Sequence, residues 1–200
     1  MMESLEFHSK DKVYWNVLAL DSETFFILKS LSKPNLRIWL EEDINNVDLF
    51  NLRLERTYME YCWSLASILL DFLIKESLHR SKLVYVDADI FFYGDINNSL
   101  EVLKHGDIAI HEHRFNSKPA INVKKVGRFN VGVVAGNYSI EFNECIQEWK
   151  RKVLDECVLD TNLGKCGDQH YLNEWPEKFT SLKIMNGNGD GAGVWNLQNA

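Results

Sequence analysis

The sequence predicts one α/β domain in which a mostly parallel sheet is flanked by helices. Short apolar runs of strand length alternate with longer stretches whose apolar residues recur every three or four positions. The strand-like runs are apolar on successive residues, as expected of strands buried on both faces. A chain of 200 residues, of which 46% are hydrophobic, can bury a full core and has room for a single domain.

The first half of the chain contains three predicted strands and two predicted helices. The strands are expected at residues 13–20, 36–40 and 82–86. One helix is expected to begin at the cap formed by Asp21 and to reach Leu31. Thr57 can cap a longer helix that runs to about His79 and carries one broad apolar stripe. The acidic, Asn-rich segment 41–50 is expected to be a loop.

The second half of the chain continues the alternation, and no internal repeat is evident. Strands are expected at residues 107–111, 129–135 and 182–185, and helices near 98–104, 139–158 and 168–173. The long polar segment 112–127 is expected to be an irregular loop. Loops of that length often act as lids or binding loops.

Composition narrows the classes of function. The 22 basic and 29 acidic residues give a formal net charge of −7, whereas a nucleic-acid partner requires a dense basic face. We therefore expect a small-molecule partner, and an anionic one would need a metal ion to offset its charge. The content of 3 Pro and 11 Gly argues against a disordered or collagen-like chain.

The sequence also predicts a cytoplasmic protein without a transmembrane segment. No apolar run approaches the roughly 18 residues that a span needs, and the first residues lack the pattern of a secretory signal. The four cysteines, Cys62, Cys145, Cys157 and Cys166, form no C-x-x-C pair. We interpret Cys145 and Cys157 as small buried hydrophobic residues, which fits a reducing compartment.

Two motifs have the spacing of metal ligands. Asp87 and Asp89, here called the acid pair, directly follow the third predicted strand, where both could bind one divalent cation that keeps positions open for phosphate oxygens. About one D-x-D is expected by chance, and a capped turn is the alternative interpretation, but ligands of α/β folds collect beyond strand ends. His111 and His113 form an H-x-H pair, a signal of low specificity.

Further candidate residues follow another strand and flank two helices. Gly132 allows close approach of a ligand, and Asn130 offers donors and an acceptor, although a packing Gly beside a satisfied Asn is equally plausible. Asp168, followed by Gln169, is an ordinary helix N-cap in the simplest interpretation. Arg56 precedes the long helix, where it faces either a diphosphate or the solvent.

Four ordered motifs together carry a resemblance. They are YVDADIFF at 85–92, RFNVG at 128–132, GDQHYLNEWP at 167–176 and GVWN at 193–196. In this order they resemble the GT-A-fold glycosyltransferases, the nucleotide-diphospho-sugar transferase superfamily. Within it they are similar to the glycogenin and lipopolysaccharide-glucosyltransferase type, glycosyltransferase family 8 and its bacterial relatives. The resemblance extends from about Trp15 onward, and segment 56–63 contributes to it.

The resemblance implies a metal-dependent hexosyltransferase. Such an enzyme transfers a hexose from a nucleotide-diphosphate sugar, of the UDP type, to a glycan or another hydroxyl acceptor. It implies that Asp87 reaches the ribose and the metal, and that Asp89 ligates Mn²⁺ or Mg²⁺. Asn130 and Gly132 would line the donor-sugar pocket, and Arg56, in the segment 56–63 that shares the resemblance, is a further candidate for donor binding.

The same resemblance assigns the catalytic role to the GDQ segment. Asp168 and Gln169 would face the sugar near the reacting carbon, where Asp168 could position the acceptor or stabilise developing positive charge. A metal that neutralises the leaving diphosphate lowers the barrier as a Lewis acid. The protein would then mainly orient the two substrates and exclude water.

Two features depart from the family pattern. Members of the group have an additional central strand, expected beside residues 83–86, whose following loop holds the nucleotide base. Residues 1–12 resemble only the tail of the next helix. The resemblance therefore implies a single domain over residues 1–200 that lacks the first strand and is truncated at both ends, or a degenerate relative. Relatives also often place a metal-binding His near the closing motif, where Asp190 or Asn188 stands here.

Two other functions compete with a transferase. A haloacid-dehalogenase-like phosphatase also uses D-x-D after a buried strand, but it needs Thr or Val at the position where Phe91 stands. It also needs a distal Lys and paired acidic residues, for which no convincing set is found. A non-catalytic remnant that binds a sugar nucleotide or a glycan is the second alternative, and the short N-terminal part favours it.

Overall fold

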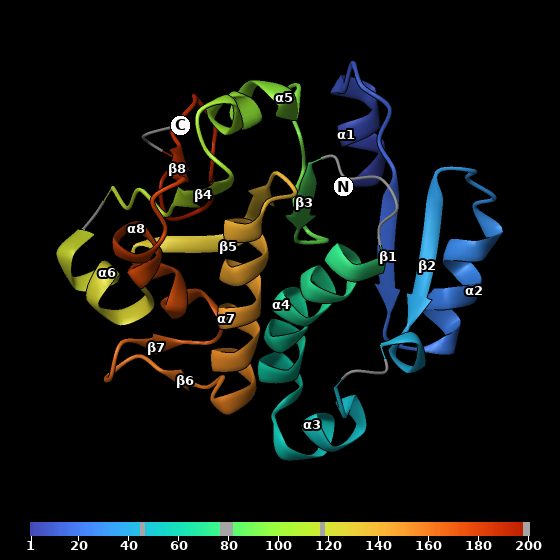
Figure 1. The fold of residues 1–200 in the computed structure, drawn as a ribbon, viewed down its shortest axis with the longest axis horizontal. Coiled ribbons are helices and arrows are strands. Elements are labelled where there is room, and N and C mark those ends of the chain that lie inside the picture. Colours follow the sequence, from blue (N-terminus) through green and yellow to red (C-terminus); the bar gives the residue numbers. More distant parts are fainter. Residues whose placement is uncertain (45–46, 77–81, 117–118, 198–200) are drawn as a thin grey trace.

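A four-stranded sheet forms the centre of the structure and contains the strand that leads into the acid pair. The computed structural model describes residues 1–44, 47–76, 82–116 and 119–197. The sheet has the order β3-β5-β4-β8, with β3 at Leu83–Val86, β4 at Ile108–Glu112, β5 at Phe129–Gly136 and β8 at Leu182–Met185. Two strand pairs lie outside it: β1 (Trp15–Ala19) with β2 (Leu36–Leu40), and β6 (Leu159–Asp160) with β7 (Lys165–Cys166). Figure 1 shows their arrangement.

Strand direction is mixed rather than uniform. β5 pairs antiparallel with both β3 and β4, whereas β4 pairs parallel with β8 and β1 pairs parallel with β2. The expectation of a mostly parallel sheet is therefore only partly met. The reason is that β5 lies between β3 and β4 and runs against both. A register shift in the β4–β5 pairing falls between Ile110 and His111, at the end of the sheet that carries the candidate residues.

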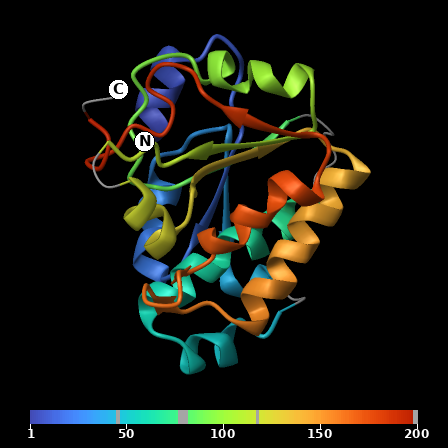
Figure 2. The same ribbon diagram turned by 90° about the vertical axis from the view of Figure 1, so that its left-hand side faces the viewer.

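Helices cover both faces of this sheet (Figure 2). On one face lie α4 (Tyr58–Glu76) and α7 (Ile140–Asp155), which contribute to the largest apolar core. On the other face, α5 (Ile96–Ser99) continues into the 3₁₀ helix η2 (Leu100–Lys104). The other helical segments are α1 (Met2–His8), α2 (Ser22–Ser30), η1 (Glu41–Asp43), α3 (Leu49–Glu55), α6 (Pro119–Val126), η3 (Gln169–Glu174) and α8 (Trp175–Lys178).

Capping residues begin the long helices as the sequence predicts. The Asp21 side chain accepts a hydrogen bond from the Thr24 N–H at 2.6 Å and starts α2. Before α4, the Thr57 N–H donates to the Glu60 carboxylate at 3.1 Å, and the Glu60 N–H donates back to the Thr57 hydroxyl at 3.4 Å. Ser139 caps α7. The predicted end of the long helix at His79 lies outside the described residues.

Two segments that we expected to be loops contain helices. Residues 41–50 hold η1 and the start of α3, which Asp48 caps and whose Leu49 and Leu52 are buried. Residues 112–127 hold α6, which begins at Pro119, a residue suited to the first helical position. Both predictions were wrong for these helical stretches, because a polar composition does not exclude short helices, whereas residues 113–116 are irregular as expected.

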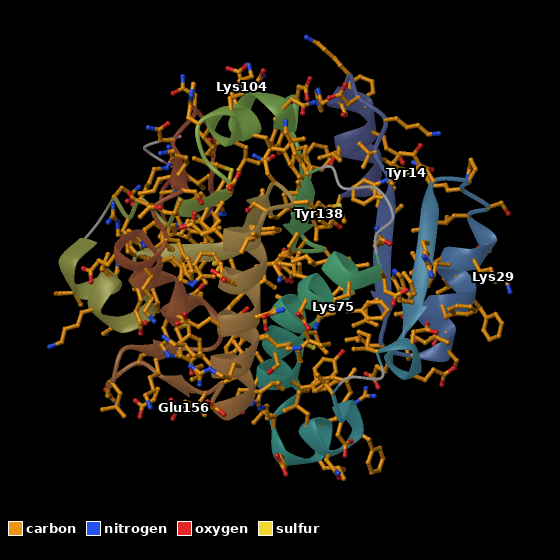
Figure 3. The ribbon with its side chains drawn as sticks, viewed as in Figure 1. Tyr14, Lys29, Lys75, Lys104, Tyr138 and Glu156 are labelled. Carbon is orange, nitrogen blue, oxygen red and sulfur yellow. The ribbon has the colours of Figure 1, made fainter. Side chains whose placement is uncertain are left out.

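One buried ion pair joins the two long helices. Asp71 of α4 is fully buried and forms ion pairs with Lys75 at 2.8 Å and with Lys150 of α7. Lys75, labelled in Figure 3, is about half exposed, whereas Lys150 is 16% exposed. The carboxylate therefore ties α7 to α4 beneath the sheet.

Within the described residues, no helix combines the length and the apolar character that a membrane crossing requires.

Candidate functional site

The acid pair lies in a turn at the end of β3, as the sequence predicts. The Asp87 N–H donates to the Gly132 carbonyl at 3.0 Å, and the Ile90 N–H donates back to the Asp87 carbonyl at 3.3 Å. This turn places Asp87 inward, half-buried, and leaves Asp89 exposed. The Tyr85 hydroxyl donates to Oδ1 of Asp87 at 2.7 Å. One carboxylate is thus held by the strand while the other faces the solvent.

The three candidate carboxylates influence one another. Burial raises the pKa of Asp87, the charge of Asp89 raises it as well, and the hydrogen bond from Tyr85 partly offsets both. Burial also raises the pKa of Asp168 well above its ordinary value, and the charge of Asp87 adds to that effect. The structure therefore brings Asp87, Asp89 and Asp168 into one electrostatic neighbourhood, in which a cation would relieve the repulsion.

Asp168 does not act as the ordinary helix cap that its position suggests. It precedes η3, but its side chain makes no capping hydrogen bond, and it is only 4% exposed. Its carbonyl accepts a 3.0 Å hydrogen bond from the indole N–H of Trp149, a buried residue of α7. The backbone of the GDQ segment is therefore anchored to the core while the carboxylate remains near Asp87.

An amide network, formed by Asn130, Gln169 and His113, makes another wall of the site. Asn130 Oδ1 accepts from the Gly132 N–H at 2.8 Å. Its Nδ2 lies 3.4 Å from Gln169 Oε1 and 3.3 Å from His113 Nε2. Gln169 Nε2 donates to the Val126 carbonyl at 2.9 Å. The two amides thus join β5, η3 and the segment after β4.

The close packing around residue 132 leaves no space for a side chain, so glycine is needed there. A Cβ atom on this residue would lie 2.7 Å from Asn130 Oδ1 and 3.3 Å from Ile90 Cδ1. It would also lie 3.7 Å from Nε2 of the buried His111. A larger residue would therefore displace the Asn130 amide, so Gly132 and Asn130 act as one structural unit.

His113 has a larger role than its H-x-H motif suggested. Its ring is buried, stacks on Phe115 with 4.8 Å between ring centroids, and lies edge-on to Trp195. Its carbonyl accepts from the Trp195 indole at 2.9 Å and from Asn196 Nδ2 at 2.6 Å. The closing GVWN motif therefore holds the backbone of His113. Burial lowers the pKa of His113 to about 4, so the ring is neutral and its Nε2 can accept from Asn130.

Two sequence candidates lie elsewhere or are already engaged. The guanidinium of Arg56 donates to the carbonyls of Val153 and Leu154, at 2.7 and 2.9 Å, and to the Ser64 hydroxyl. Arg56 therefore binds carbonyl groups in the last turn of α7, and it is not brought together with the acid pair. The Asp190 carboxylate accepts from the Gly187 N–H at 2.7 Å and from the Ser99 hydroxyl, so it stabilises its own turn.

The acid pair could hold a metal ion through its carboxylate oxygens, but a substrate would have to supply the remaining ligands. Across the described part of the chain, no group of three His, Cys, Asp or Glu side chains is placed to hold an ion. The acid pair supplies carboxylate oxygens, and the pKa of Asp87 is raised chiefly by burial, with a smaller contribution from the charge of Asp89. Mg²⁺ is commonly held by one or two carboxylates together with substrate phosphates. The donor set is compatible with that arrangement.

Two curated proteins of Bacillus subtilis (strain 168) are similar to the chain along nearly all of its length. YfnD is 24% identical over 201 residues, which cover 100% of this chain and 64% of YfnD. YfnF is 28% identical over 203 residues, which cover 98% of this chain and 66% of YfnF. The chain thus spans slightly less than two thirds of either relative. Both are described as uncharacterized proteins. No protein-family model matches the sequence.

Proposed function

We propose that the protein is a metal-dependent glycosyltransferase domain that takes a hexose from a nucleotide-diphosphate sugar, of the UDP type, and transfers it to a hydroxyl acceptor. The observation that carries the proposal is the meeting of three motifs at one end of the four-stranded sheet. Asp87 after β3 is bonded to Gly132 of β5, and Asn130 of β5 is bonded to Gln169. The order of these motifs in the sequence is the second support.

The acid pair would hold the metal in this proposal. Asp87 and Asp89 would ligate Mn²⁺ or Mg²⁺, which, when bound, would supply Lewis-acid stabilisation of the leaving diphosphate. Tyr85 fixes the orientation of Asp87 through its 2.7 Å hydrogen bond. The exposed Asp89 completes the pair from the solvent side. Asp190, which the resemblance implies as a further ligand, is not part of the proposed metal site, because its carboxylate already accepts hydrogen bonds from Gly187 and Ser99.

The donor sugar would lie between the amide network and Asp168. Gly132 lets the Asn130 amide lie close to the strand, because a Cβ atom at residue 132 would lie 2.7 Å from Asn130 Oδ1. Asp168, buried and anchored through Trp149, would orient the acceptor or stabilise positive charge that develops on the sugar. Asn130 and Gln169 would exchange their mutual hydrogen bond for bonds to sugar hydroxyls. The protein would act chiefly by orientation and by exclusion of water.

Calorimetric titration of UDP with and without Mn²⁺ tests the proposal. We expect binding that depends on Mn²⁺ and that Asp89→Asn weakens by at least about tenfold, which is about 1.4 kcal/mol. Asp155→Asn is the matched control, since Asp155 is 70% exposed and pairs with Arg151 on the outer surface of α7. Equal Mn²⁺-dependent binding by the wild-type protein and Asp89→Asn would contradict the proposal.

A second candidate, a module that binds a sugar nucleotide without transferring the sugar, is favoured by one observation. The Asn130 amide already has its oxygen and its nitrogen engaged within the protein, and Gln169 is engaged with Val126. A binding module could leave this network closed. Mn²⁺-dependent UDP binding without hydrolysis of UDP-glucose and without transfer to an added acceptor would support this second candidate.

A further inference from the structure

The segment that leads from the acid pair to α5 exposes two aromatic rings. It comprises residues 90–95 and lies between β3 and α5 (Figure 1). Phe91 is 60% exposed and Tyr93 is 87% exposed. Their ring centroids lie 4.9 Å apart, with an angle of 53° between the ring planes. We call these two residues the aromatic pair. Single exposed aromatic residues are common on protein surfaces, whereas two rings in mutual contact form one continuous apolar surface.

Burial alternates along this segment. Asp89, Phe91 and Tyr93 are exposed, whereas Ile90 and Phe92 are half-buried. Alternation with a period of two is typical of an extended chain, whose successive side chains point to opposite sides. The exposed carboxylate of the acid pair and both aromatic rings therefore lie on the same solvent-facing side. Because two residues span at most about 7 Å of backbone, a molecule that binds the aromatic pair also reaches the acid pair.

The backbone beneath the aromatic pair is fixed at three points. The Phe92 N–H donates to the hydroxyl of Ser4 in α1 at 3.1 Å. Ile90 packs toward β5, where its Cδ1 would lie 3.3 Å from a Cβ atom on Gly132. The Asp95 side chain caps α5. The rings are therefore presented to the solvent on an ordered backbone, and such preorganisation lowers the entropic cost of binding a ligand.

We propose that the aromatic pair binds a sugar ring of a neutral glycan acceptor and so brings one hydroxyl of that glycan to the donor site beside the acid pair. This inference rests on the proposed function, because the acceptor hydroxyl has to lie where the hexose is transferred. One face of a pyranose ring consists of C–H groups with a small positive charge, and the face of an aromatic ring is negative. The sugar would stack on a ring while its hydroxyl groups point toward water and toward Asp89.

The surroundings favour a neutral glycan over other occupants. Asp89 precedes the aromatic pair, Asp95 follows it, and the chain has a formal net charge of −7, so an anionic bilayer would be repelled. A second copy of the chain would need more apolar surface than two rings, because stable interfaces bury roughly 800 Å² on each partner. A Cβ atom on Gly94 would meet no atom within 4 Å, so the space beside Tyr93 is open to a ligand.

An NMR titration of ring resonances tests the proposal. The probes are cellotetraose, chitotetraose and maltotetraose, each added to the 200-residue protein with and without UDP and Mg²⁺. We expect at least one tetrasaccharide to shift the ring resonances of Phe91 and Tyr93 when it is raised to about 10 mM, which reveals a Kd of about 1 mM. Ring shifts with UDP alone and with none of the tetrasaccharides would assign the aromatic pair to the nucleotide base and overturn the proposal.

Matched variants separate ring stacking from a general apolar contact. Tyr93→Leu keeps an apolar side chain but removes the ring, so it should weaken glycan binding by at least about fivefold. Tyr93→Phe keeps the ring and should change the Kd by less than about twofold. Phe50→Leu, on the exposed surface of α3, is the control for an aromatic residue elsewhere. Equal binding by Tyr93→Leu and the wild type, or a dimer of the protein that buries the aromatic pair, would contradict the proposal.

The glycan site and the proposed function can fail separately. Ring shifts with a tetrasaccharide but no metal-dependent UDP binding would support the glycan site and contradict the proposed function. Metal-dependent UDP binding without ring shifts from any tetrasaccharide would overturn the glycan site and leave the proposed function standing.

Discussion

The hydroxyl of Tyr85 lies 2.7 Å from Oδ1 of Asp87 and donates a hydrogen bond to it. The Tyr85 ring packs against the largest apolar core, and burial together with the Asp87 charge raises the pKa of its hydroxyl well above the ordinary value. The proton therefore stays on Tyr85. A core residue thus fixes the orientation of the half-buried carboxylate at the candidate site.

Tyr85→Phe tests this relationship. The variant removes the donor from a half-buried carboxylate, so we expect a loss of about 1–2 kcal/mol in the free energy of unfolding and weaker Mn²⁺-dependent UDP binding. Denaturant titration and calorimetry measure the two effects. Tyr171→Phe is the control, because the Tyr171 hydroxyl donates to the Glu156 carbonyl at 2.8 Å, away from the acid pair. Unchanged UDP binding by Tyr85→Phe would contradict the positioning role.

Gly132→Ala should be far more harmful than Gly94→Ala. The added Cβ at residue 132 would lie 2.7 Å from Asn130 Oδ1, whereas a Cβ at residue 94 would meet no atom within 4 Å. We expect Gly132→Ala to lower the free energy of unfolding by about 1–3 kcal/mol and to disrupt the amide network. Denaturation curves of both variants measure this. Equal stability of the two variants would contradict the close contact between residue 132 and Asn130 Oδ1.

The two lysines that pair with the buried carboxylate of Asp71 should contribute unequally to stability. Lys150, 16% exposed, and Lys75, 48% exposed, both pair with it. Lys150→Met should lower the free energy of unfolding by about 2 kcal/mol or more, because it weakens the compensation of a buried charge. Lys75→Met should cost less than about 1 kcal/mol, because Lys75 is half exposed and Lys150 still pairs with the carboxylate. Chemical denaturation at neutral pH measures both, and the reverse ranking would contradict the structure.

Because His113 is buried, we expect the free energy of unfolding to fall in acid. Burial lowers its pKa from the ordinary 6.5 to about 4, so the unfolded chain takes up this proton at higher pH than the folded chain does. The resulting stability is complete above about pH 6.5 and falls as the pH drops toward about 4, by up to about 3 kcal/mol. Denaturant titrations across this range should show a shallower pH dependence for His113→Gln than for the wild type. Identical slopes would contradict the prediction.

Local sequence signals predicted the parts of the fold that local chemistry determines. The strand at Leu36–Leu40 and the strand at Leu182–Met185 have the predicted bounds, because each is a short apolar run between polar breaks. Capping at Asp21 is also confirmed, since it involves residues only three apart. The antiparallel course of β5 was not predicted, because an apolar run has the same pattern in either direction.

Long-range contacts decided what the sequence could not show about the candidate site. Arg56 binds carbonyls 97 and 98 residues away, so no local pattern could separate this role from one at a diphosphate. Asp190 is engaged by Ser99, 91 residues earlier. His113 had a weak local signal in its H-x-H motif, and its link to Asn130 and to the closing GVWN motif appears only once β4 and β5 are paired.

Paramagnetic broadening by Mn²⁺ tests the central claim most directly. In the presence of UDP, NMR amide resonances of the protein should broaden first at Asp87, Ala88 and Asp89, and next at the neighbouring Gly132 and Asp168. The ion would then lie at the acid pair with its diphosphate toward β5 and η3. Broadening centred on another acidic segment, such as Glu41–Asp43, or no broadening that depends on UDP, would contradict the account.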